Sequence, residues 1–376
     1  DPIIVLEPSS GDIIDDESFA VKWEPVEKAD YYSMDTIAYS NPMDKNRGML
    51  RYGITYNFKC ENPKDEGFVF KVDKLRSQAN VYSYEDDWVP TPATILGGFL
   101  PGFDYPIIIK AFDKDGNLVG SSQGQRVYLD QMNSINIKGE LSQGEHLILK
   151  GEYEKAIEHY KETLAENPED MEALKYLAKF YTLGWEEGTI DYIKAVDYGE
   201  KYYHLNGDSH LLLETISNMN HRDKKLNKKL LEEILDNTPE EDKDFYYYNQ
   251  LGSYYEGIGE YSEAIRAYEK MDAYMPSNTL LMDLYLGDLG SALERVNNPS
   301  LQLYMISRKT LVRSIEALSL GDLETEDYKY FQEILEKELS GELRGEEGKQ
   351  LFYKLRKMIM NPDIRAILDE FKEIIL

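Results

Sequence analysis

The chain has 376 residues and a formal net charge of −28, and 42% of its residues are apolar. This composition supplies enough apolar side chains for real hydrophobic cores, and the length predicts two or three domains. The strong acidity argues against a nucleic-acid partner, which needs a basic stripe, and disfavours docking on anionic lipid.

The chain has one cysteine, Cys60, so an intrachain disulfide is excluded. The longest apolar run, residues 95–109, is interrupted by glycine, proline and aspartate, so no membrane span or signal peptide is visible in the sequence. The sequence begins at Asp1 without methionine. We therefore expect that a targeting or lipid-anchor segment was removed before Asp1, and that any membrane attachment ran through that segment alone.

Residues 1–130 have the pattern of a β domain. Short runs of β-branched and aromatic residues are separated by proline, glycine and aspartate. In the clearest run, Phe19, Val21 and Trp23 alternate with other residues and so share one face of a strand. We predict strands at residues 19–23, 30–37, 49–60, 67–72, 107–112 and 117–120, with a hairpin turn at Asp113–Gly116 between the last two.

Two motifs in this domain resemble the fibronectin type III sandwich. The first is Val21-Lys-Trp23-Glu-Pro25, and the second is Phe99-Leu-Pro-Gly-Phe-Asp-Tyr105. In that family the tryptophan fills the space between two sheets, and the tyrosine hydroxyl bonds back to the preceding loop. The resemblance implies a β-sandwich. Residues 40–96 are too many for the usual connecting strands, so the middle of the domain is expanded.

The expanded middle carries an aromatic segment, residues 80–94, with Tyr82, Tyr84 and Trp88. Exposed aromatic rings are good anchors for a partner, so these side chains could form a contact surface. The alternative is that the rings cover the edge of the sandwich, since large apolar side chains are more often buried than displayed.

Motifs that suggest chemistry lack the context that the chemistry needs. Gly120-Ser-Ser-Gln-Gly124 matches the G-x-S-x-G string of hydrolases, but no histidine occurs before His146. The acidic turn at Asp113–Asn117 lacks the distant glutamate of a calcium loop, and the five histidines lack metal-ligand spacing. The sequence therefore predicts no catalytic residue, no metal site, no cofactor and no enzyme activity. A serine hydrolase would require histidine and aspartate beside Ser122.

After about residue 143, apolar residues recur at three- and four-residue spacing, which predicts helices. One helical hairpin, residues 248–276, has a second copy at residues 144–168. The residues shared by the two copies are Gly144, Gly151, Ala156, Tyr160 and Pro168, which recur as Gly252, Gly259, Ala264, Tyr268 and Pro276. This spacing closely resembles the tetratricopeptide repeat, a hairpin of about 34 residues that cannot bury its apolar face alone.

The resemblance implies further repeats between and beyond the two copies. Three repeats of about 34 residues fit the interval once the insertion Gly184–Gly188 is allowed for. The intermediate hairpins are residues 171–207 and 210–244, and a fifth begins at Ser277. Helices at residues 301–320, 326–339, 346–360 and 362–375 are predicted to complete and cap the stack.

In the tetratricopeptide family, the first helix of each repeat lines a concave groove, and ligands contact its non-packing positions. Carried over by register, these positions are Lys175, Lys179, Asn218, Arg222, Tyr246, Asn249 and Ser253. The three cations would place positive charge inside an acidic protein, which suits an acidic peptide or a carboxylate. The alternative is that all of these are ordinary solvated side chains.

Together the resemblances imply a multidomain β + α protein, with a fibronectin type III-like β-sandwich at residues 1–130 and an α-helical tetratricopeptide superhelix at residues 131–376. We expect a non-enzymatic scaffold that binds a protein or peptide in the concave groove. Fibronectin-type modules in bacteria are usually extracytoplasmic, so a secreted or envelope-anchored protein of the lipoprotein type is implied. The alternative is a carbohydrate-binding accessory protein that uses the aromatic segment. The oligomeric state stays open.

Overall fold

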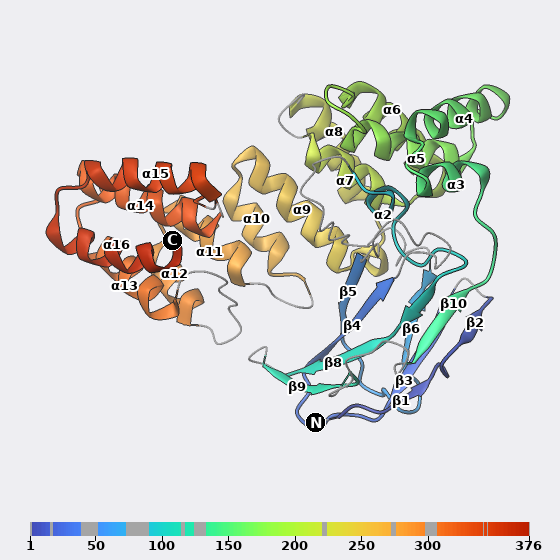
Figure 1. Ribbon diagram of the computed structural model, residues 1–376, viewed down its shortest axis with the longest axis horizontal. Helices are drawn as coiled ribbons and strands as arrows, with labels where there is room; N and C mark the ends of the chain where they lie inside the picture. The colour runs from blue at the N-terminus through green and yellow to red at the C-terminus, as the bar shows by residue number, and fades with distance from the viewer. Residues whose placement is uncertain are drawn as a thin grey trace. The chain divides into compact units, whose positions relative to one another are not determined.

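The computed structural model shows a region of strands followed by a long series of helices (Figure 1). The structure describes the chain apart from residues 1, 16–17, 39–51, 73–89, 114–116, 124–132, 220–223, 272–275, 298–306, 341, 344 and 376. The chain divides into two compact units. The first is formed mainly by Asp1–Lys114 and Leu118–Gly257, and the second mainly by Ile258–Lys270 and Tyr274–Leu376.

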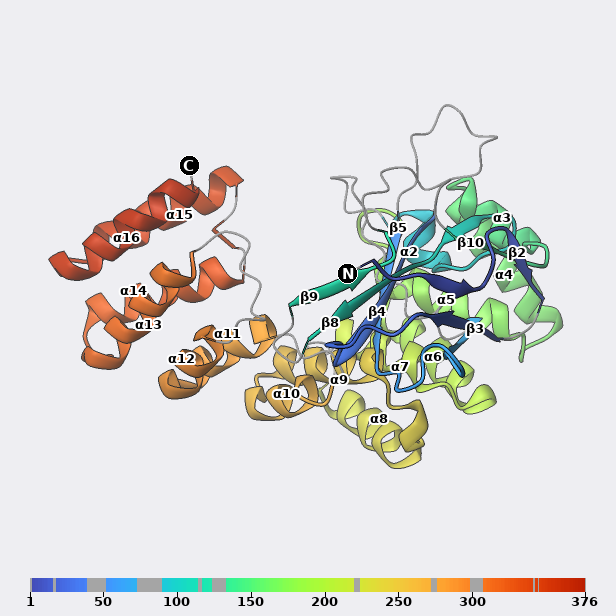
Figure 2. The same ribbon diagram turned by 90° about the horizontal axis from the view of Figure 1, so that it is seen from below.

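Two antiparallel sheets form most of the strand region. One has the order β1-β3-β6 and the other the order β5-β4-β8-β9, in which β8 and β9 lie side by side (Figure 2). Each predicted strand segment contains a strand of these sheets. The strands of the two sheets are β1 (Val5–Glu7), β3 (Ser18–Trp23), β4 (Tyr31–Ala38), β5 (Tyr52–Phe58), β6 (Phe68–Lys71), β8 (Ile108–Phe112) and β9 (Leu118–Ser121).

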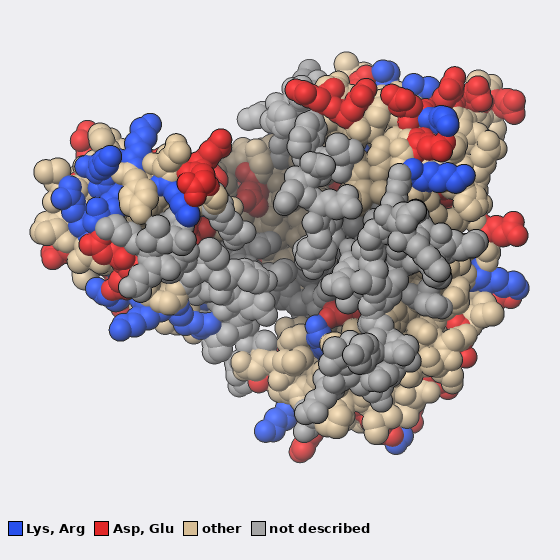
Figure 3. Space-filling view, in the orientation of Figure 1, with Lys and Arg blue, Asp and Glu red and all other residues tan. Residues whose placement is uncertain are grey.

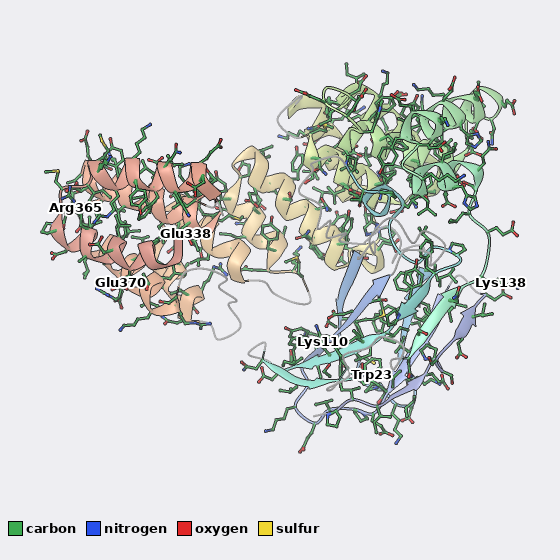
Figure 4. All side chains as sticks on the ribbon, in the orientation of Figure 1. Trp23, Lys110, Lys138, Glu338, Arg365 and Glu370 are labelled. Atoms are coloured by element: carbon green, nitrogen blue, oxygen red, sulfur yellow. The ribbon has the colours of Figure 1, made fainter. Side chains whose placement is uncertain are left out.

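The core of the strand region is built around Trp23, which is fully buried. Its ring meets the rings of Tyr32 and Phe58 edge-on, with centroids 4.9 and 5.8 Å apart. Tyr105 makes the contact that its sequence motif predicts. Its hydroxyl accepts a hydrogen bond from the backbone N–H of Leu100 (2.5 Å) and donates to the carbonyl of the same residue (3.2 Å). On the outer side of this region, Lys110 of β8 forms an ion pair with Asp35 of β4 (Figure 4).

A third, small sheet was not predicted. It joins β2 (Asp12–Ile14), β10 (Ser134–Ile137) and β7 (Asp104–Pro106), and β10 runs parallel to β2 and antiparallel to β7. Ile135 and Ile137 of β10 are buried. The strand region therefore extends beyond residue 130, where the sequence placed the domain boundary. Strands of three or four residues are too short to show a clear period of two, which explains the difference.

The helices of the first unit fall within the segments that the sequence predicted to be helical, apart from one short helix. A short helix, α2 (Pro92–Leu96), comes first. The others are α3 (Gln143–Leu149), α4 (Tyr153–Glu166), α5 (Met171–Leu183), α6 (Tyr192–Asn206), α7 (Ser209–Asn218), α8 (Lys224–Asn237) and α9 (Phe245–Ile258). Their starts follow the usual capping chemistry, since Ser142 and Glu145 form a capping box at α3 and an aspartate side chain caps each of α5, α6 and α7.

Gly144 sets the closest approach between the first two hairpin helices. A Cβ atom at this position would lie 2.2 Å from the ring of Tyr160 in α4, so only glycine fits. The Tyr160 hydroxyl donates to Glu172 of α5 (3.0 Å), and the Tyr176 hydroxyl of α5 donates to Glu145 of α3 (2.7 Å). Buried polar groups with such partners fix the relative position of the three helices.

The strand region and the first helices share one apolar core. It contains Ile95 and Leu96 of α2 together with Ile148 of α3, Tyr160 of α4 and Tyr176 of α5. The short helix α2 packs against both α3 and α5. The first helical hairpin therefore buries its apolar face against the strand region as well as against the next hairpin.

In the second unit, the described residues after Gly257 form helices and the turns between them. The helices are α10 (Tyr261–Tyr268), α11 (Pro276–Leu286), α12 (Leu289–Asn297), α13 (Arg308–Leu320), α14 (Glu326–Leu339), α15 (Gly345–Met358) and α16 (Pro362–Ile375). They share a core of their own, formed by the side chains of α11 to α16. The boundary between the units, at Gly257 and Ile258, falls inside the predicted fourth repeat, so α9 and α10 belong to different units.

Ion pairs link neighbouring helices of the second unit. Arg295 of α12 contacts Asp283 of α11 and lies 3.0 Å from Glu269, which follows α10. Arg313 of α13 pairs with Glu370 of α16, whose other carboxylate oxygen accepts a hydrogen bond from Thr310 (3.0 Å). Within the described residues, no helix has the length and apolar character needed to cross a membrane.

We expect Gly144→Ala to destabilise the first unit by about 1–3 kcal/mol, because the added methyl group must displace the Tyr160 ring. The matched control is Gly199→Ala in α6, where a Cβ atom would lie 3.5 Å from Leu212, an ordinary contact. The control should be neutral or gain up to about 1 kcal/mol from helix propensity. Urea unfolding followed by circular dichroism measures both, and equal effects would contradict the packing argument.

Candidate functional site

The helices α5, α7 and α9 are the first helices of three successive predicted repeats. At equivalent positions they carry the small residues Ala178, Ser217 and Gly252, all of which are buried. In the sequence register, the next residue of each helix points toward the predicted groove. Those residues are Lys179, Asn218 and Ser253.

The two lysines of α5 do not form an open basic surface. Most side chains of α5 are buried, and Lys179 is only 6% exposed. Lys175 is half-buried, with its ammonium group 5.5 Å from the centroid of the Tyr176 ring. A helix that is buried all round lies inside a protein rather than along a groove, and α5 is the helix against which α2 packs. This burial differs from the exposed position that the sequence suggested.

The predicted residues of α7 and α9 are more accessible. Asn218 and Ser253 are exposed, and Asn249 is half-buried. The Asn218 amide donates to the backbone carbonyl of Glu214, one turn earlier in α7 (2.8 Å). Tyr246, in contrast, is buried and stacks on the ring of His210. Arg222 and the aromatic residues Tyr82, Tyr84 and Trp88 lie outside the described residues.

A buried polar cluster, which sequence reasoning missed, joins the starts of α7 and α9. His210 is the central residue, and its side chain is only 5% exposed. Its Nδ1 lies 2.8 Å from an Asp208 carboxylate oxygen, and its Nε2 lies 3.2 Å from an Asp244 carboxylate oxygen. Each aspartate also accepts a backbone N–H at the start of its helix, from His210 in α7 (3.0 Å) and from Tyr247 in α9 (3.0 Å). We call this set the histidine clamp.

The two carboxylates keep the imidazole of His210 charged. Burial alone lowers the pKa of His210, but hydrogen bonds and charge interactions with Asp208 and Asp244 outweigh it and raise the pKa to about 9. Burial likewise acts to raise the pKa of Asp208, yet its bond to His210 holds that pKa below the usual value. The histidine clamp is therefore a cation held between two anions at neutral pH.

The tyrosine beside the clamp is held by its own acidic partner. Burial, together with the charge and hydrogen bond of Glu214, raises the pKa of Tyr246 well above its ordinary value, so its hydroxyl stays protonated. The clamp could have been found from the sequence, because His210 and Asp244 are 34 residues apart, one repeat length. Both residues lie at the start of the first helix of a predicted hairpin, and the starts of neighbouring hairpins are expected to lie close together.

The remaining candidate groups have structural roles. The Ser122 hydroxyl accepts a hydrogen bond from the backbone N–H of Ile109 (2.8 Å), which ties the end of β9 to β8. Burial raises the pKa of the Cys60 thiol, whose sulfur donates to the carbonyl of Gly67 (3.3 Å). In the part of the chain that the structure describes, no three His, Cys, Asp or Glu side chains gather in a way that could hold a metal ion.

No protein-family model, curated protein or solved structure matches this chain.

We expect His210→Ala to lower the free energy of unfolding by about 3 kcal/mol at neutral pH, because it leaves the half-buried carboxylates of Asp208 and Asp244 without their cation. The matched control is His204→Ala. That side chain is half exposed and lies 3.6 and 3.5 Å from Glu200 and Glu233, so its loss should cost less than about 1 kcal/mol. Chemical unfolding of the two variants tests this, and similar losses would show that the clamp adds no stability.

The clamp should also make stability depend on pH. The pKa of His210 rises from the ordinary 6.5 to about 9 on folding, so the protonated form favours the folded state. The stabilisation is fully present below about pH 6.5 and is lost as the pH rises through 9, by roughly 3 kcal/mol. We expect the stability of the wild type to fall over this interval more than that of His210→Ala. Parallel pH profiles for the two proteins would exclude a charged His210.

Proposed function

We propose that this chain is a non-enzymatic scaffold, with a fibronectin type III-like module followed by tetratricopeptide-like hairpins, that binds a protein or peptide beside α7 and α9. Two features support the first part. The antiparallel sheets β1-β3-β6 and β5-β4-β8-β9 enclose the buried Trp23, and the Tyr105 hydroxyl bonds back to Leu100. Both are properties of immunoglobulin-like sandwiches.

The helical part is supported by residues that recur at repeat intervals. Helices follow one another as short hairpins, and Gly144 brings α3 and α4 together by contact with Tyr160. The equivalent small residues of the later repeats, Ala178, Ser217 and Gly252, are buried as well. Stacks of such hairpins form extended surfaces that recognise polypeptides.

The observation that carries the proposal is the exposure of Asn218 and Ser253. Each follows the buried small residue of its helix, so the two occupy the same register position in successive repeats. An amide and a hydroxyl can both donate and accept hydrogen bonds, which suits the backbone of an extended peptide. Because Lys179 is covered and Glu214 lies on the same face of α7 as Asn218, this surface favours an uncharged or basic segment over the acidic ligand first expected.

The proposed setting of the protein rests on the same resemblance. Fibronectin-type modules suggest a secreted or cell-envelope location. The carbohydrate-binding alternative depends on Tyr82, Tyr84 and Trp88, which lie outside the described residues. The described residues therefore support peptide binding at the surface of α7 and α9.

The proposal is tested with a displayed library of short linear peptides, selected on the full chain. Peptides recovered from the library are labelled, and their affinities are measured by fluorescence anisotropy. We expect Asn218→Arg and Ser253→Arg each to weaken the binding of one group of peptides about tenfold or more, because a long charged side chain replaces a hydrogen-bonding contact.

The matched control is Asn237→Arg in α8. Asn237 is exposed, and its amide donates to the backbone carbonyl one turn earlier (2.9 Å), as that of Asn218 does. The substitution is therefore chemically the same on a different helix. Peptide affinities that change equally in Asn218→Arg and Asn237→Arg, or in neither, would overturn the assignment of the surface.

A further inference from the structure

One face of α15 combines exposed cations with exposed apolar side chains. Tyr353, Lys354, Lys357 and Met358 recur at three- and four-residue spacing and are all exposed, while Phe352 and Leu355 point into the core. Met360 follows the helix and is 73% exposed. We call Tyr353, Lys354, Lys357, Met358 and Met360 the α15 surface.

The turn that displays Met360 is held firmly in place. The carboxylate of Asp327, in the first turn of α14, accepts hydrogen bonds from the backbone N–H groups of Met360 (2.7 Å) and Asn361 (3.0 Å). Arg365, near the start of α16, donates to the carbonyl of Ile359 (2.6 Å) (Figure 4). Ile359 itself is fully buried between the two exposed methionines. A turn fixed by three bonds pays little conformational entropy when a partner binds.

The charges of this surface differ from those of the chain as a whole. Within the described part of the molecule, neither Lys354 nor Lys357 forms an ion pair, whereas Lys349 pairs with Glu346 and Arg356 with Asp369. Lys and Arg side chains gather over this part of the surface (Figure 3). In a protein with a net charge of −28, a cationic and apolar face is exceptional and needs an explanation.

We propose that the α15 surface binds an acidic amphipathic segment of a partner protein, a segment in which aspartate or glutamate flanks apolar residues at helical spacing. Lys354 and Lys357 would meet the carboxylates, and Met358, Met360 and Tyr353 would receive the apolar side chains. Methionine adapts its shape to different partners, and tyrosine is a frequent anchor of interfaces. This site is separate from the surface of α7 and α9.

Two other occupants are disfavoured by the same charges. A membrane of anionic lipid is an extended negative surface, which would repel the −28 charge of the chain as it approached. A second copy of this chain carries the same −28 charge. A short acidic segment interacts only within about 8–10 Å, the screening length at physiological salt, and so is influenced chiefly by the local lysines.

The proposal is tested by selecting a displayed library of helix-forming peptides on the full chain. We expect the selection to recover a group of peptides that are rich in aspartate and glutamate and carry apolar residues three and four positions apart. Their affinity should fall about tenfold or more in the double variant Lys354→Glu/Lys357→Glu, and again in Met358→Ser/Met360→Ser. Added salt should weaken the wild-type complex.

The matched control is Lys228→Glu/Lys229→Glu on α8, which changes the net charge of the chain by the same amount at two other exposed lysines. It should leave these affinities unchanged, and so should Asn218→Arg, which affects the surface of α7 and α9. The proposal is overturned if no peptide depends on the α15 surface or if the control weakens binding equally. It is also overturned if the α15 variants instead abolish binding to phosphatidylserine vesicles or self-association measured by sedimentation.

Discussion

The organisation of the first unit depends on one constraint, which is that a single helical hairpin cannot bury its own apolar face. The apolar face of the hairpin of α3 and α4 is covered on two sides. The next hairpin covers one side, and the strand region covers the other through α2, so Ile95, Leu96, Ile148 and Tyr176 belong to one core. The strand region thus acts as the N-terminal cap of the helices in its unit, in addition to being a folded module.

That arrangement also limits where the proposed peptide could contact the helices of the first unit. The helix α5, which carries Lys175 and Lys179, packs against α2, α4, α6 and α7, and the side chain of Lys179 is buried. At the equivalent positions of the predicted register, Asn218 of α7 and Ser253 of α9 are exposed. Of the three cations that the sequence placed in the groove, Lys179 is buried and Lys175 half-buried, and Arg222 lies outside the described residues.

At the junction of α7 and α9, charge replaces apolar packing as the specific contact. Asp208 and Asp244 cap their own helices, and the single imidazole of His210 joins the two caps. A cation between two anions satisfies all three groups only when the two helix starts are correctly aligned. We therefore expect the clamp to contribute specificity of alignment as well as stability, since fixing register is the best-attested use of buried ionic groups.

The sequence predicted the features that depend on local periodicity. The alternation of Phe19, Val21 and Trp23 located β3, and the recurrence of Gly144 as Gly252 located the helical hairpins. It did not predict contacts that depend on tertiary structure. The strand β10 has four residues, and its position is set by pairing with β2 and β7. Lys179 is buried on α5, a helix that also packs against α2 from a distant part of the chain. Neither contact leaves a periodic signal in the sequence.

The same distinction explains why the two proposed surfaces differ in how they could be identified from the sequence. Asn218 and Ser253 are visible as a pair only through the repeat, since each is an ordinary polar residue on its own helix. The α15 surface has no counterpart in a repeat, and it stands out because its unpaired lysines and exposed methionines occur in an acidic chain. Each surface is complete within its own compact unit. A scaffold with one neutral, hydrogen-bonding surface and one cationic, apolar surface could hold two chemically different polypeptides without either competing for the other's site.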